Sequence, residues 1–237
     1  MEHSINYSKI PLPNLSVIIP TLNETSQLAK CLKPLTGVAG EIIIADGGSS
    51  DDTLLIAKNH GCKVVVAHRG RGKQLRAGAA AATTPWLLFL HADTILDDRW
   101  SHAVSQFIIT PQNQKKVAAF QYKNDLPGLS AWFLEKFVMI RSNLGLVYGD
   151  QGLVIESNYY AQLGGYRELA IMEDIEFCQR IGRRNILVVS AFALTSGRRY
   201  KHTGVLLRSL KNIMCLCLYF LGFPIKTIEK LYGTDQS

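Results

Sequence analysis

Polar and charged residues follow four apolar runs of the sequence, each at the point where the run ends. Asn23 and Glu24 follow the first run, Asp46 ends the second, Arg69 and Arg71 follow the third, and Asp93 ends the fourth. In an open parallel sheet the carboxyl ends of the strands form the ligand crevice, so we expect one pocket to receive side chains from all four runs. Taken singly, each of these residues is equally well explained as a helix cap or a turn former.

Residues 46–53 form a loop rich in glycine and hydroxyl groups before a predicted helix. Backbone N–H groups of such a loop can face an anionic ligand, while Asp46 can accept hydrogen bonds from a base or ribose. Asp51 or Asp52 is then expected to cap the helix. The loop matches neither the P-loop pattern nor the dinucleotide fingerprint, and residues 70–73 also lack P-loop spacing. We interpret residues 70–73 as a flexible cationic turn that can approach phosphate.

Asp93 ends a buried run, where a carboxylate is unfavourable unless something compensates its charge. A divalent ion between Asp93 and a diphosphate would do so and would neutralise charge on a leaving nucleotide. Two alternatives remain open at this stage: Asp93 caps a helix that begins near Asp97 or Asp98, and His91 is a structural histidine.

Glu173 and Asp174 open a predicted helix after the turn at Gly164 and Gly165. The positive end of the helix dipole favours the ionised form of a carboxylate there, and an ionised carboxylate can act as a base. The alternative is an ordinary acid at a helix N-terminus. Glu176 and Arg180, four residues apart, are expected to form an ordinary surface pair.

Short β-branched runs alternate with helical stretches from residue 16 onward, which predicts a parallel sheet covered by helices on both faces. Strands are expected at 17–19, 42–44, 64–66, 87–90, 117–122, 153–156 and 186–189, and helices at 26–35, 53–60, 73–82, 100–109, 129–142, from 173, and at 205–223. We expect a single α/β domain: an extension (1–15), a nucleotide-binding half (16–125), an acceptor and catalytic half (126–203) and a C-terminal helical segment (204–237).

Composition limits the class of protein. The 237 residues are 47% hydrophobic, which excludes a disordered, collagen-like or disulfide-stapled chain. The net charge of +7 favours anionic partners, but the basic residues are dispersed without interleaved aromatics, so nucleic acid is not expected. Five cysteines without a C-x-x-C pair suit a reducing compartment and are expected in the core.

The two ends of the chain bear on location. Residues 1–15 lack the pattern of a secretion signal, which predicts a cytoplasmic protein. The uninterrupted apolar run at 213–223 is shorter than the ~20 residues that span a bilayer, so the predicted apolar helix at 205–223 is expected to lie at the inner face of the membrane, in a homodimer contact, or against the sheet.

Together these motifs resemble the inverting family 2 glycosyltransferases of the GT-A fold, and a small bacterial subgroup of about this length in particular. The resemblance rests on residues 16–24, 44–53, 69–78, 88–93, 149–152, 164–166 and 172–174, in this order along nearly the whole chain. It implies a mostly parallel central sheet with helices on both faces and transfer of a sugar, with inversion, from a UDP- or GDP-linked donor to a hydroxyl acceptor, which could be a lipid.

The resemblance also implies roles for individual residues. The nucleoside would lie beside Pro20, Thr21, Asn23, Glu24 and Asp46; Arg71 and Lys73 would contact the donor phosphates; and Ala92 and Asp93 would lie at the diphosphate, where Asp93 would hold Mg²⁺ or Mn²⁺. Gly149, Asp150, Gln151 and Glu173 would lie near the donor or acceptor sugar, and Asp174 would take the proton from the acceptor hydroxyl.

One motif departs from the family pattern. The Asp-x-Asp metal motif reads His91-Ala92-Asp93 here, so the first carboxylate is missing, which bears on metal affinity rather than on donor binding. His202 could complete the coordination, or it could belong to a solvated basic segment. Arg198 and Arg199 could clamp the diphosphate, or they could face an anionic leaflet.

Two other functions compete with this interpretation. A sugar-phosphate nucleotidyltransferase would need a glycine-rich N-terminal loop with a basic residue, whereas residues 20–24 are acidic and contain no glycine. A nucleotide-sugar-binding or membrane-associated protein without turnover would explain His91 and the apolar C-terminal helix, but it gives no reason for the pair Glu173 and Asp174.

Overall fold

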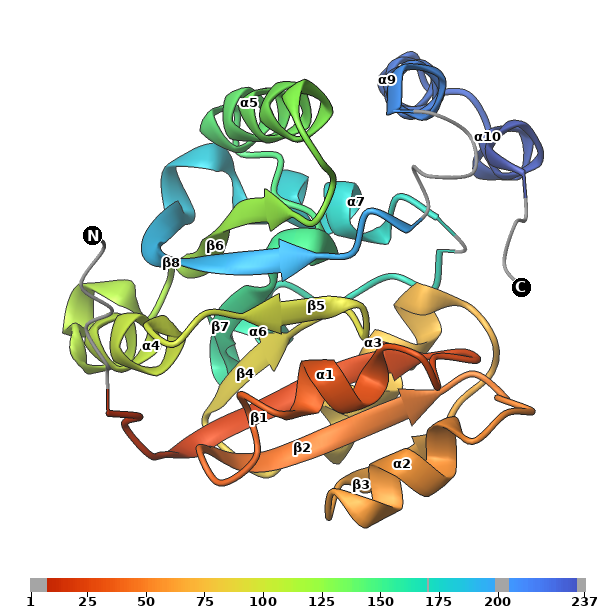
Figure 1. The fold of residues 1–237 in the computed structure, drawn as a ribbon. Coiled ribbons are helices and arrows are strands. Elements are labelled where there is room, and N and C mark those ends of the chain that lie inside the picture. Colours follow the sequence, from red (N-terminus) through yellow and green to blue (C-terminus); the bar gives the residue numbers. More distant parts are fainter. Residues whose placement is uncertain (1–7, 170, 199–204, 234–237) are drawn as a thin grey trace.

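The computed structural model describes residues 8–169, 171–198 and 205–233. Its centre is an eight-stranded sheet in the order β3-β2-β1-β4-β7-β6-β8-β5. The strands are β1 (Leu12–Thr21), β2 (Ala39–Asp46), β3 (Lys63–Val66), β4 (Trp86–Phe89), β5 (Thr94–Leu96), β6 (Val117–Asn124), β7 (Leu153–Glu156) and β8 (Ile186–Thr195). The predicted mixed α/β architecture is confirmed (Figure 1).

The pairing of strands changes across the sheet. Strands β1 to β4 form a parallel half in which β1 pairs with both β2 and β4. Strand β7 joins β4 and β6 by antiparallel pairing, β6 and β8 are parallel, and β5 closes the far edge antiparallel to β8. The sheet is therefore mostly parallel, as predicted, with its antiparallel pairs confined to β5 and β7.

Alternate residues of the central strands face two separate hydrophobic cores. Val17, Ile19 and Leu88 belong to one core, together with residues of α1 (Leu28–Leu32), α2 (Thr53–Asn59) and α4 (Trp100–Ile109). Ile18 and Phe89 belong to the other core, together with residues of α3 (Arg71–Ala81), α6 (Ser157–Gln162) and α7 (Glu173–Ile181). A strand buried on both faces reads as a continuous apolar run, which is why the sequence predicted these strands.

The cationic turn expected at residues 70–73 is instead the beginning of a helix. Helix α3 starts at Arg71, two residues before the predicted start, after Gly70 at φ 133°. Gly72 lies where a Cβ would approach the carbonyl oxygen of Arg167 to 2.2 Å, so the helix packs closely against the later half of the chain there. Arg71 is consequently held on a helix rather than on a flexible loop.

Asp93 does not cap a helix near Asp97 or Asp98. The short strand β5, which was not predicted, follows it, and α4 begins only at Trp100. The carbonyl oxygen of Asp93 accepts a hydrogen bond from the Ser196 N–H at 3.0 Å, which fixes the start of β5 against the chain that leaves β8.

The apolar C-terminal stretch forms two helices rather than the single helix predicted for 205–223. Helix α9 (Val205–Phe220) is followed by Gly222, which has φ 81°, and the N–H of Phe223 donates to the carbonyl oxygen of Leu218 at 3.0 Å. This is a Schellman cap, and Pro224 then starts α10 (Ile225–Tyr232). Within the described residues, no helix is both long and apolar enough to cross a bilayer.

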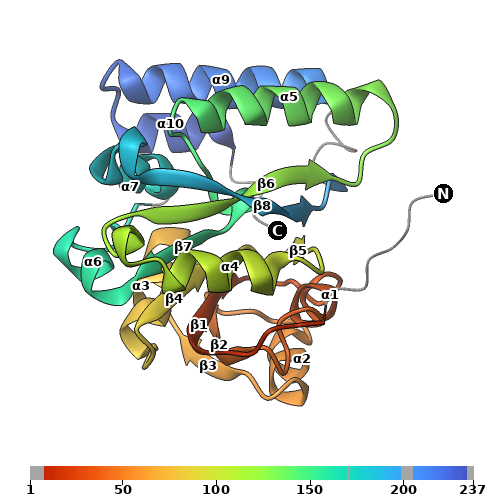
Figure 2. The ribbon, with the colours of Figure 1, turned by 90° about the vertical axis from the view of Figure 1, so that its left-hand side faces the viewer.

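Figures 1 and 2 show that helix α5 (Leu129–Asn143) and helix α9 lie along the same edge of the molecule, on the side of β6 and β8 and away from β1 to β3. Short 3-10 turns, η1 (Pro111–Asn113), η2 (Gly149–Gln151) and η3 (Arg183–Asn185), complete the chain.

Two smaller expectations are wrong. Cys217 is exposed on α9, whereas the sequence placed all five thiols in the core. The pair of Glu176 and Arg180 forms at 2.6 Å, but Glu176 is only 7% exposed, and Arg180 also donates to the carbonyl oxygens of Leu163 and Gly165. The pair therefore ties α7 to the preceding turn instead of lying on the surface.

Candidate active site

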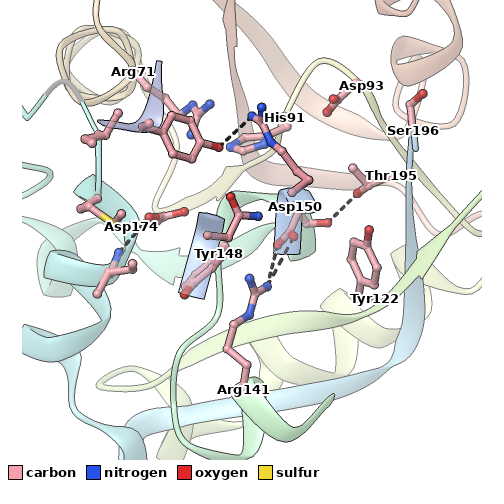
Figure 3. A pocket seen from close by; sticks show the side chains of 16 residues that line it. Arg71, His91, Asp93, Tyr122, Arg141, Tyr148, Asp150, Asp174, Thr195 and Ser196 are labelled. Atoms are coloured by element: carbon pink, nitrogen blue, oxygen red, sulfur yellow. Dashed lines mark hydrogen bonds and ion pairs between the residues drawn. The ribbon is translucent and has the colours of Figure 1, made fainter. Parts of the chain in front are cut away.

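A cavity of about 170 Å³ opens at the carboxyl ends of the strands. Its lining comes from both halves of the chain and from the C-terminal helices: Arg71, His91, Asp93, Tyr122, Arg141, Tyr148, Asp150, Ile171, Met172, Asp174, Ile175, Thr195, Ser196, Arg208, Asn212 and Tyr232. Figure 3 shows Asp93 and Asp174 on different sides of this cavity, with His91 and Asp150 between them. Two carboxylates that are 81 positions apart in the sequence therefore share one cavity.

Asp174 is a half-buried carboxylate in the first turn of α7, and it lines the cavity. Its Oδ1 accepts the N–H of Ile175 at 2.9 Å, and its Oδ2 accepts the N–H of Gly149 at 3.3 Å. Burial raises the pKa of the Asp174 carboxyl, while the positive charge of Arg71 and the hydrogen bond from Gly149 act in the opposite direction. A raised pKa makes a carboxylate a stronger base at neutral pH.

Its neighbour Glu173 occupies a different environment. Glu173 is completely buried and does not line the cavity. Its Oε1 lies 3.2 Å from Nη1 of Arg71, and burial raises its pKa to about 7 in spite of that cation. Glu173 thus holds Arg71, and Asp174 is the member of the pair that faces the cavity.

Arg71 and Lys73, which were predicted to act together on the donor phosphates, are placed differently. Arg71 lines the cavity, whereas Lys73 does not. Their contacts with a donor stay predictions.

A second ion pair, between Arg141 and Asp150, lines the cavity. Arg141 of α5 lies 3.0 Å from Asp150 and also donates to Oε1 of Gln151 at 3.1 Å, and its guanidinium carbon stands 3.3 Å from the ring centroid of Tyr148. The dashed lines in Figure 3 mark the pairing of Arg141 with Asp150 and the bond from Thr195 to Asp150. Gln151 is buried and faces away from the cavity, so its expected position at a sugar is not seen.

Gly149 lies closely against the imidazole of His91. A Cβ on this residue would lie 2.0 Å from Nε2 of His91, so a larger residue would displace that side chain, and the N–H of Gly149 donates to Oδ2 of Asp174 at 3.3 Å. The turn at η2 therefore contacts both the imidazole of His91 and the carboxylate of Asp174.

The residues expected around the nucleoside form a separate cluster at the ends of β1 and β2. Asp46 is 1% exposed, and its carboxylate accepts four hydrogen bonds: from the hydroxyls of Thr21 and Ser49 at 2.8 and 2.5 Å, and from the N–H groups of Gly48 and Ser49 at 2.8 Å each. These bonds lower the pKa of Asp46 against the opposing effect of burial, which is the largest single influence. Asp46 thus organises the 47–50 loop, and its contact with a base stays a prediction.

Asn23 adopts a left-handed backbone conformation, with φ 56°, at the tip of the loop after β1. Its side-chain oxygen accepts the N–H of Ser50 at 2.9 Å, and its own N–H donates to the hydroxyl of Ser49 at 2.9 Å. The two loops are therefore joined before any ligand binds. Pro20 and Glu24 flank the same loop.

Arg198 connects this cluster with the cavity. Its Nη1 donates to the hydroxyl of Ser26 at 2.8 Å, and its Nη2 lies 3.6 Å from Oε2 of Glu24. Ser196, two residues earlier, lines the cavity. Arg199 and His202, the other residues predicted in this segment, lie outside the described residues.

Comparison with known proteins decides the family. Residues 16–186 match glycosyl transferase family 2. The chain belongs to this family. It is 29% identical to an uncharacterised glycosyltransferase of Rickettsia prowazekii (strain Madrid E) over 113 aligned residues, which make up 47% of this chain and 38% of the relative. It is 39% identical to an uncharacterised glycosyltransferase of Mycobacterium tuberculosis (strain ATCC 25618 / H37Rv) over 85 aligned residues, which make up 35% of this chain and 38% of the relative.

The matched segments span about four-tenths of the length of these curated relatives. Among solved structures, S. aureus TarS 1–349 has a TM-score of 0.61 at 17% identity over 92% of this chain and 69% of that one. Glucosyl-3-phosphoglycerate synthase from Mycobacterium tuberculosis has a TM-score of 0.59 at 20% identity over 89% and 81%. These likenesses show the fold that the sequence resemblance predicted.

The role of Asp93 as a metal ligand stays a prediction. Asp93 is half-buried and lines the cavity, but it does not end β4 as the sequence predicted: β4 ends at Phe89, and Asp93 directly precedes β5. In the described part of the chain, no group of three His, Cys, Asp or Glu side chains could enclose an ion. One carboxylate completed by substrate phosphates and water is a usual binding mode for Mg²⁺, so the donor set fits a metal that arrives with a diphosphate.

Sequence reasoning assigned no role to Arg141, Arg208, Asn212 or Tyr232, all of which line the cavity. One signal was available for the two arginines. Each interrupts an apolar helical stretch, and a cation in such a place needs a compensating partner.

Proposed function

We propose that this chain transfers a sugar, with inversion, from a nucleotide-diphosphate sugar to the hydroxyl group of an acceptor. The observation that carries the proposal is the shared cavity, in which Asp93 and Asp174 face the same space with Arg71 at its wall. The cavity of about 170 Å³ is smaller than the roughly 300–1,000 Å³ of ordinary ligand sites, so it suits the reacting sugar and phosphates, with the nucleoside outside at the Asp46 loop.

The reaction uses Asp174 as general base. Its free lone pairs take the proton of the acceptor hydroxyl as that oxygen attacks the anomeric carbon. A new carbon–oxygen bond forms, the bond from the anomeric carbon to the diphosphate breaks, and the nucleoside diphosphate leaves with the electron pair. Attack and departure on opposite sides of the carbon invert its configuration, which matches the placement of Asp174 and Asp93 across the cavity from each other.

Charge develops on the leaving diphosphate during this step. A Mg²⁺ or Mn²⁺ ion at Asp93 would neutralise part of that charge when bound. Arg198 stands between the cavity segment and Glu24, where its guanidinium can bind phosphate oxygens in the bidentate manner.

Solved structures with this fold support a UDP-linked donor. The synthase from Mycobacterium tuberculosis is described in complex with Mn²⁺ and uridine-diphosphate-glucose, and TarS is described in complex with UDP-GlcNAc. The cluster around Asp46 lies at the ends of β1 and β2, where a nucleoside would join a diphosphate at Asp93.

A product-release assay tests the proposal. UDP- and GDP-sugars are incubated with Mn²⁺ or Mg²⁺ and a cell lipid and metabolite extract, and nucleoside diphosphate is measured. Asp174→Asn is expected to lower turnover by about 10²–10⁴-fold, the usual contribution of a general base, without loss of donor affinity. Asp98→Asn makes the same change at an exposed position and serves as the matched control.

The same assay separates the competing functions. Release of pyrophosphate from a nucleoside triphosphate in place of nucleoside diphosphate would indicate a nucleotidyltransferase. Donor binding that is unchanged by Asp174→Asn, with no product from any donor, would indicate a binding protein without turnover.

We further propose that the edge formed by α5 and α9 contacts an anionic lipid leaflet on the cytoplasmic side. Large apolar side chains are exposed there, including Trp132 (53%), Phe133 (62%), Leu207 (67%) and Leu210 (68%). Apart from Arg141 and Arg208, which are buried in the cavity lining, helices α5, α9 and α10 carry four basic residues, Lys136, Lys211, Lys226 and Lys230, against two acids, Glu135 and Glu229. Apolar side chains within a basic frame favour an anionic membrane surface over a neutral one.

Co-sedimentation with vesicles tests this contact. Binding is expected with 30% phosphatidylglycerol and not with pure phosphatidylcholine, and it should fall when Phe133→Ser and Leu210→Ser are combined. Leu55→Ser changes an equally exposed leucine on α2 and should have no effect. A homodimer held by this edge would instead show concentration-dependent mass in solution and no preference among vesicles.

A further inference from the structure

The wall that the C-terminal helices add to the cavity contains a buried arginine that has no carboxylate partner among the described residues. Arg208 of α9 is 9% exposed, and its Nη2 donates to the hydroxyl of Tyr232 at 3.2 Å. Its guanidinium carbon lies 5.0 Å from the centroid of the same ring. No described carboxylate lies within 4.0 Å of Arg208, whereas the cavity residues Arg71 and Arg141 pair with Glu173 and Asp150.

A buried guanidinium is unfavourable unless an anion or several hydrogen bonds compensate its charge. Arginine has five N–H donors, and the phenol of Tyr232 accepts from one of them. The remaining donors match the paired oxygens of a phosphate or a carboxylate. The position of Arg208 in the cavity lining makes such a ligand accessible to it.

Asn212 supplies a second, independent observation. It follows Arg208 by one helical turn, lines the same cavity, and its Oδ1 is buried with no hydrogen-bond partner in the described chain. An unsatisfied buried oxygen is unfavourable, and a ligand hydroxyl would satisfy it. The wall therefore offers an anion site and a hydroxyl site one turn apart.

The C-terminal wall lies on the side of the cavity that holds Asp174, the proposed general base. Arg71 lies 3.2 Å from Glu173, the neighbour of Asp174 on α7, and Arg71, Asp174 and Tyr232 all line the cavity. Arg198, by contrast, reaches Ser26 and Glu24 in the nucleoside cluster. Arg208 and Tyr232 thus lie near Asp174, the residue assigned to the acceptor, whereas Arg198 lies near the residues assigned to the donor.

We propose that Arg208, with Tyr232 and Asn212, binds a phosphate or carboxylate group carried by the acceptor, which makes the acceptor an anionic, hydroxyl-bearing molecule. This inference rests on the proposed glycosyl transfer and names the chemical class of its acceptor. A small phosphate ester and a lipid phosphate present the same group to Arg208.

A binding experiment with the full chain tests the assignment. The protein is first saturated with UDP and Mn²⁺, and glycerol 3-phosphate is titrated by calorimetry, with glycerol as the neutral counterpart. Glycerol 3-phosphate is expected to bind and glycerol is not. Arg208→Gln should weaken the binding of glycerol 3-phosphate about tenfold or more, as loss of a charged hydrogen bond does, and Arg208→Lys should restore part of it. Arg183→Gln changes an exposed arginine on η3 and is the matched control.

Each outcome of this experiment either supports or overturns the proposed acceptor site at Arg208. Loss of glycerol 3-phosphate binding in Arg208→Gln with unchanged UDP affinity supports the acceptor site. Competition between glycerol 3-phosphate and UDP, or a parallel loss of UDP affinity, assigns Arg208 to the donor diphosphate and overturns the inference. Absence of glycerol 3-phosphate binding to the UDP-loaded wild type also overturns it. Failure of the wild type to bind any nucleotide would refute the proposed glycosyl transfer itself.

One further arm distinguishes the sources of the anion. Soluble dihexanoyl phosphatidic acid is compared with glycerol 3-phosphate on the same UDP-loaded protein. Tighter binding of the lipid that is lost in Arg208→Gln supports a lipid phosphate, and equal binding of the two supports a small phosphate ester.

Discussion

Replacement of Glu173 by glutamine should make the stability of this protein less dependent on pH. Glu173 is completely buried, and Arg71 at 3.2 Å is its partner on Oε1, while Oε2 has no hydrogen-bond partner in the described structure. Glutamine keeps the shape of the side chain and an oxygen that can accept from Arg71. It removes the charge that must otherwise be buried whenever the carboxyl loses its proton.

The magnitude follows from the pKa of Glu173, which burial raises from 4.5 to about 7. Because the folded state binds this proton more tightly than the unfolded state, stability is highest below pH 4.5 and falls as the pH rises through 7. The loss is about 1 kcal/mol at pH 5 and about 3 kcal/mol at pH 8, since one pKa unit corresponds to 1.36 kcal/mol. Glu173→Gln should therefore gain about 2 kcal/mol relative to wild type between these two pH values.

Urea unfolding of wild type and Glu173→Gln at pH 5 and pH 8 measures this difference, and the comparison of the two proteins cancels the groups they share. Asp98→Asn, at an exposed position, should show no such pH-dependent difference from wild type. An equal difference between Glu173→Gln and wild type at both pH values would refute the reasoning, because it would mean that Glu173 does not titrate in the folded protein between them.

Three further predictions concern other parts of the site. Asp46→Asn can no longer accept all four hydrogen bonds of the carboxylate and should lower the free energy of unfolding by about 2–4 kcal/mol in urea. Folding lowers the pKa of Asp46, so the stability that its ionised carboxylate contributes should be lost as the pH falls below 3.8. Acid-induced unfolding at the same pH in Asp46→Asn and in wild type would argue against this account. Gly149→Ala places a Cβ 2.0 Å from Nε2 of His91 and should reduce turnover about tenfold or more with an unaltered circular dichroism spectrum; full activity would show that the turn can move freely. EDTA should abolish UDP release, and Asp93→Asn should raise the Mn²⁺ concentration needed for half-maximal rate; activity that survives chelation would remove the metal from the mechanism.

The parallel half of the sheet could be predicted from sequence because its strands are buried on both faces. The β-branched runs at 17–19 and 42–44 lie inside β1 and β2, which end at Thr21 and Asp46. The rule for parallel sheets also placed Asp93 at this edge, whereas Asp174, in the first turn of α7, was placed at the site through the family resemblance.

The beginning of α3 could not be predicted, because glycines flank Arg71 on both sides and glycine disfavours a helix. What allows the helix there is tertiary: Gly72 packs against the carbonyl oxygen of Arg167, almost a hundred residues later. The end of α9 had a local signal, Gly222 followed by Pro224, which the apolar composition around it obscured.

The C-terminal wall of the cavity was beyond sequence reasoning for a different reason. Hydrophobic periodicity predicts that residues around Arg208 form a helix, but it carries no information on which surface that helix meets. Tyr232 lies in α10, a second helix that the sequence analysis did not separate within the predicted helical segment 204–237. The pairing of Arg141 with Asp150 likewise joins a helix to a turn whose separation in space only the fold determines.

The hydrogen bonds within the nucleoside cluster affect how acceptor preference can differ between related proteins. Asp46, Thr21 and Ser49 bond one another, and the amide of Gln74 donates to the carbonyl oxygens of Thr21 and Ala45, so every partner comes from the first third of the chain. Segments after β6 can thus be exchanged between related proteins without disturbing these bonds. Two contacts cross the boundary: Arg198 reaches Ser26 and Glu24, and Arg71 pairs with residue 173, so interchangeable acceptor modules must bring an acceptor for Arg71 at that position.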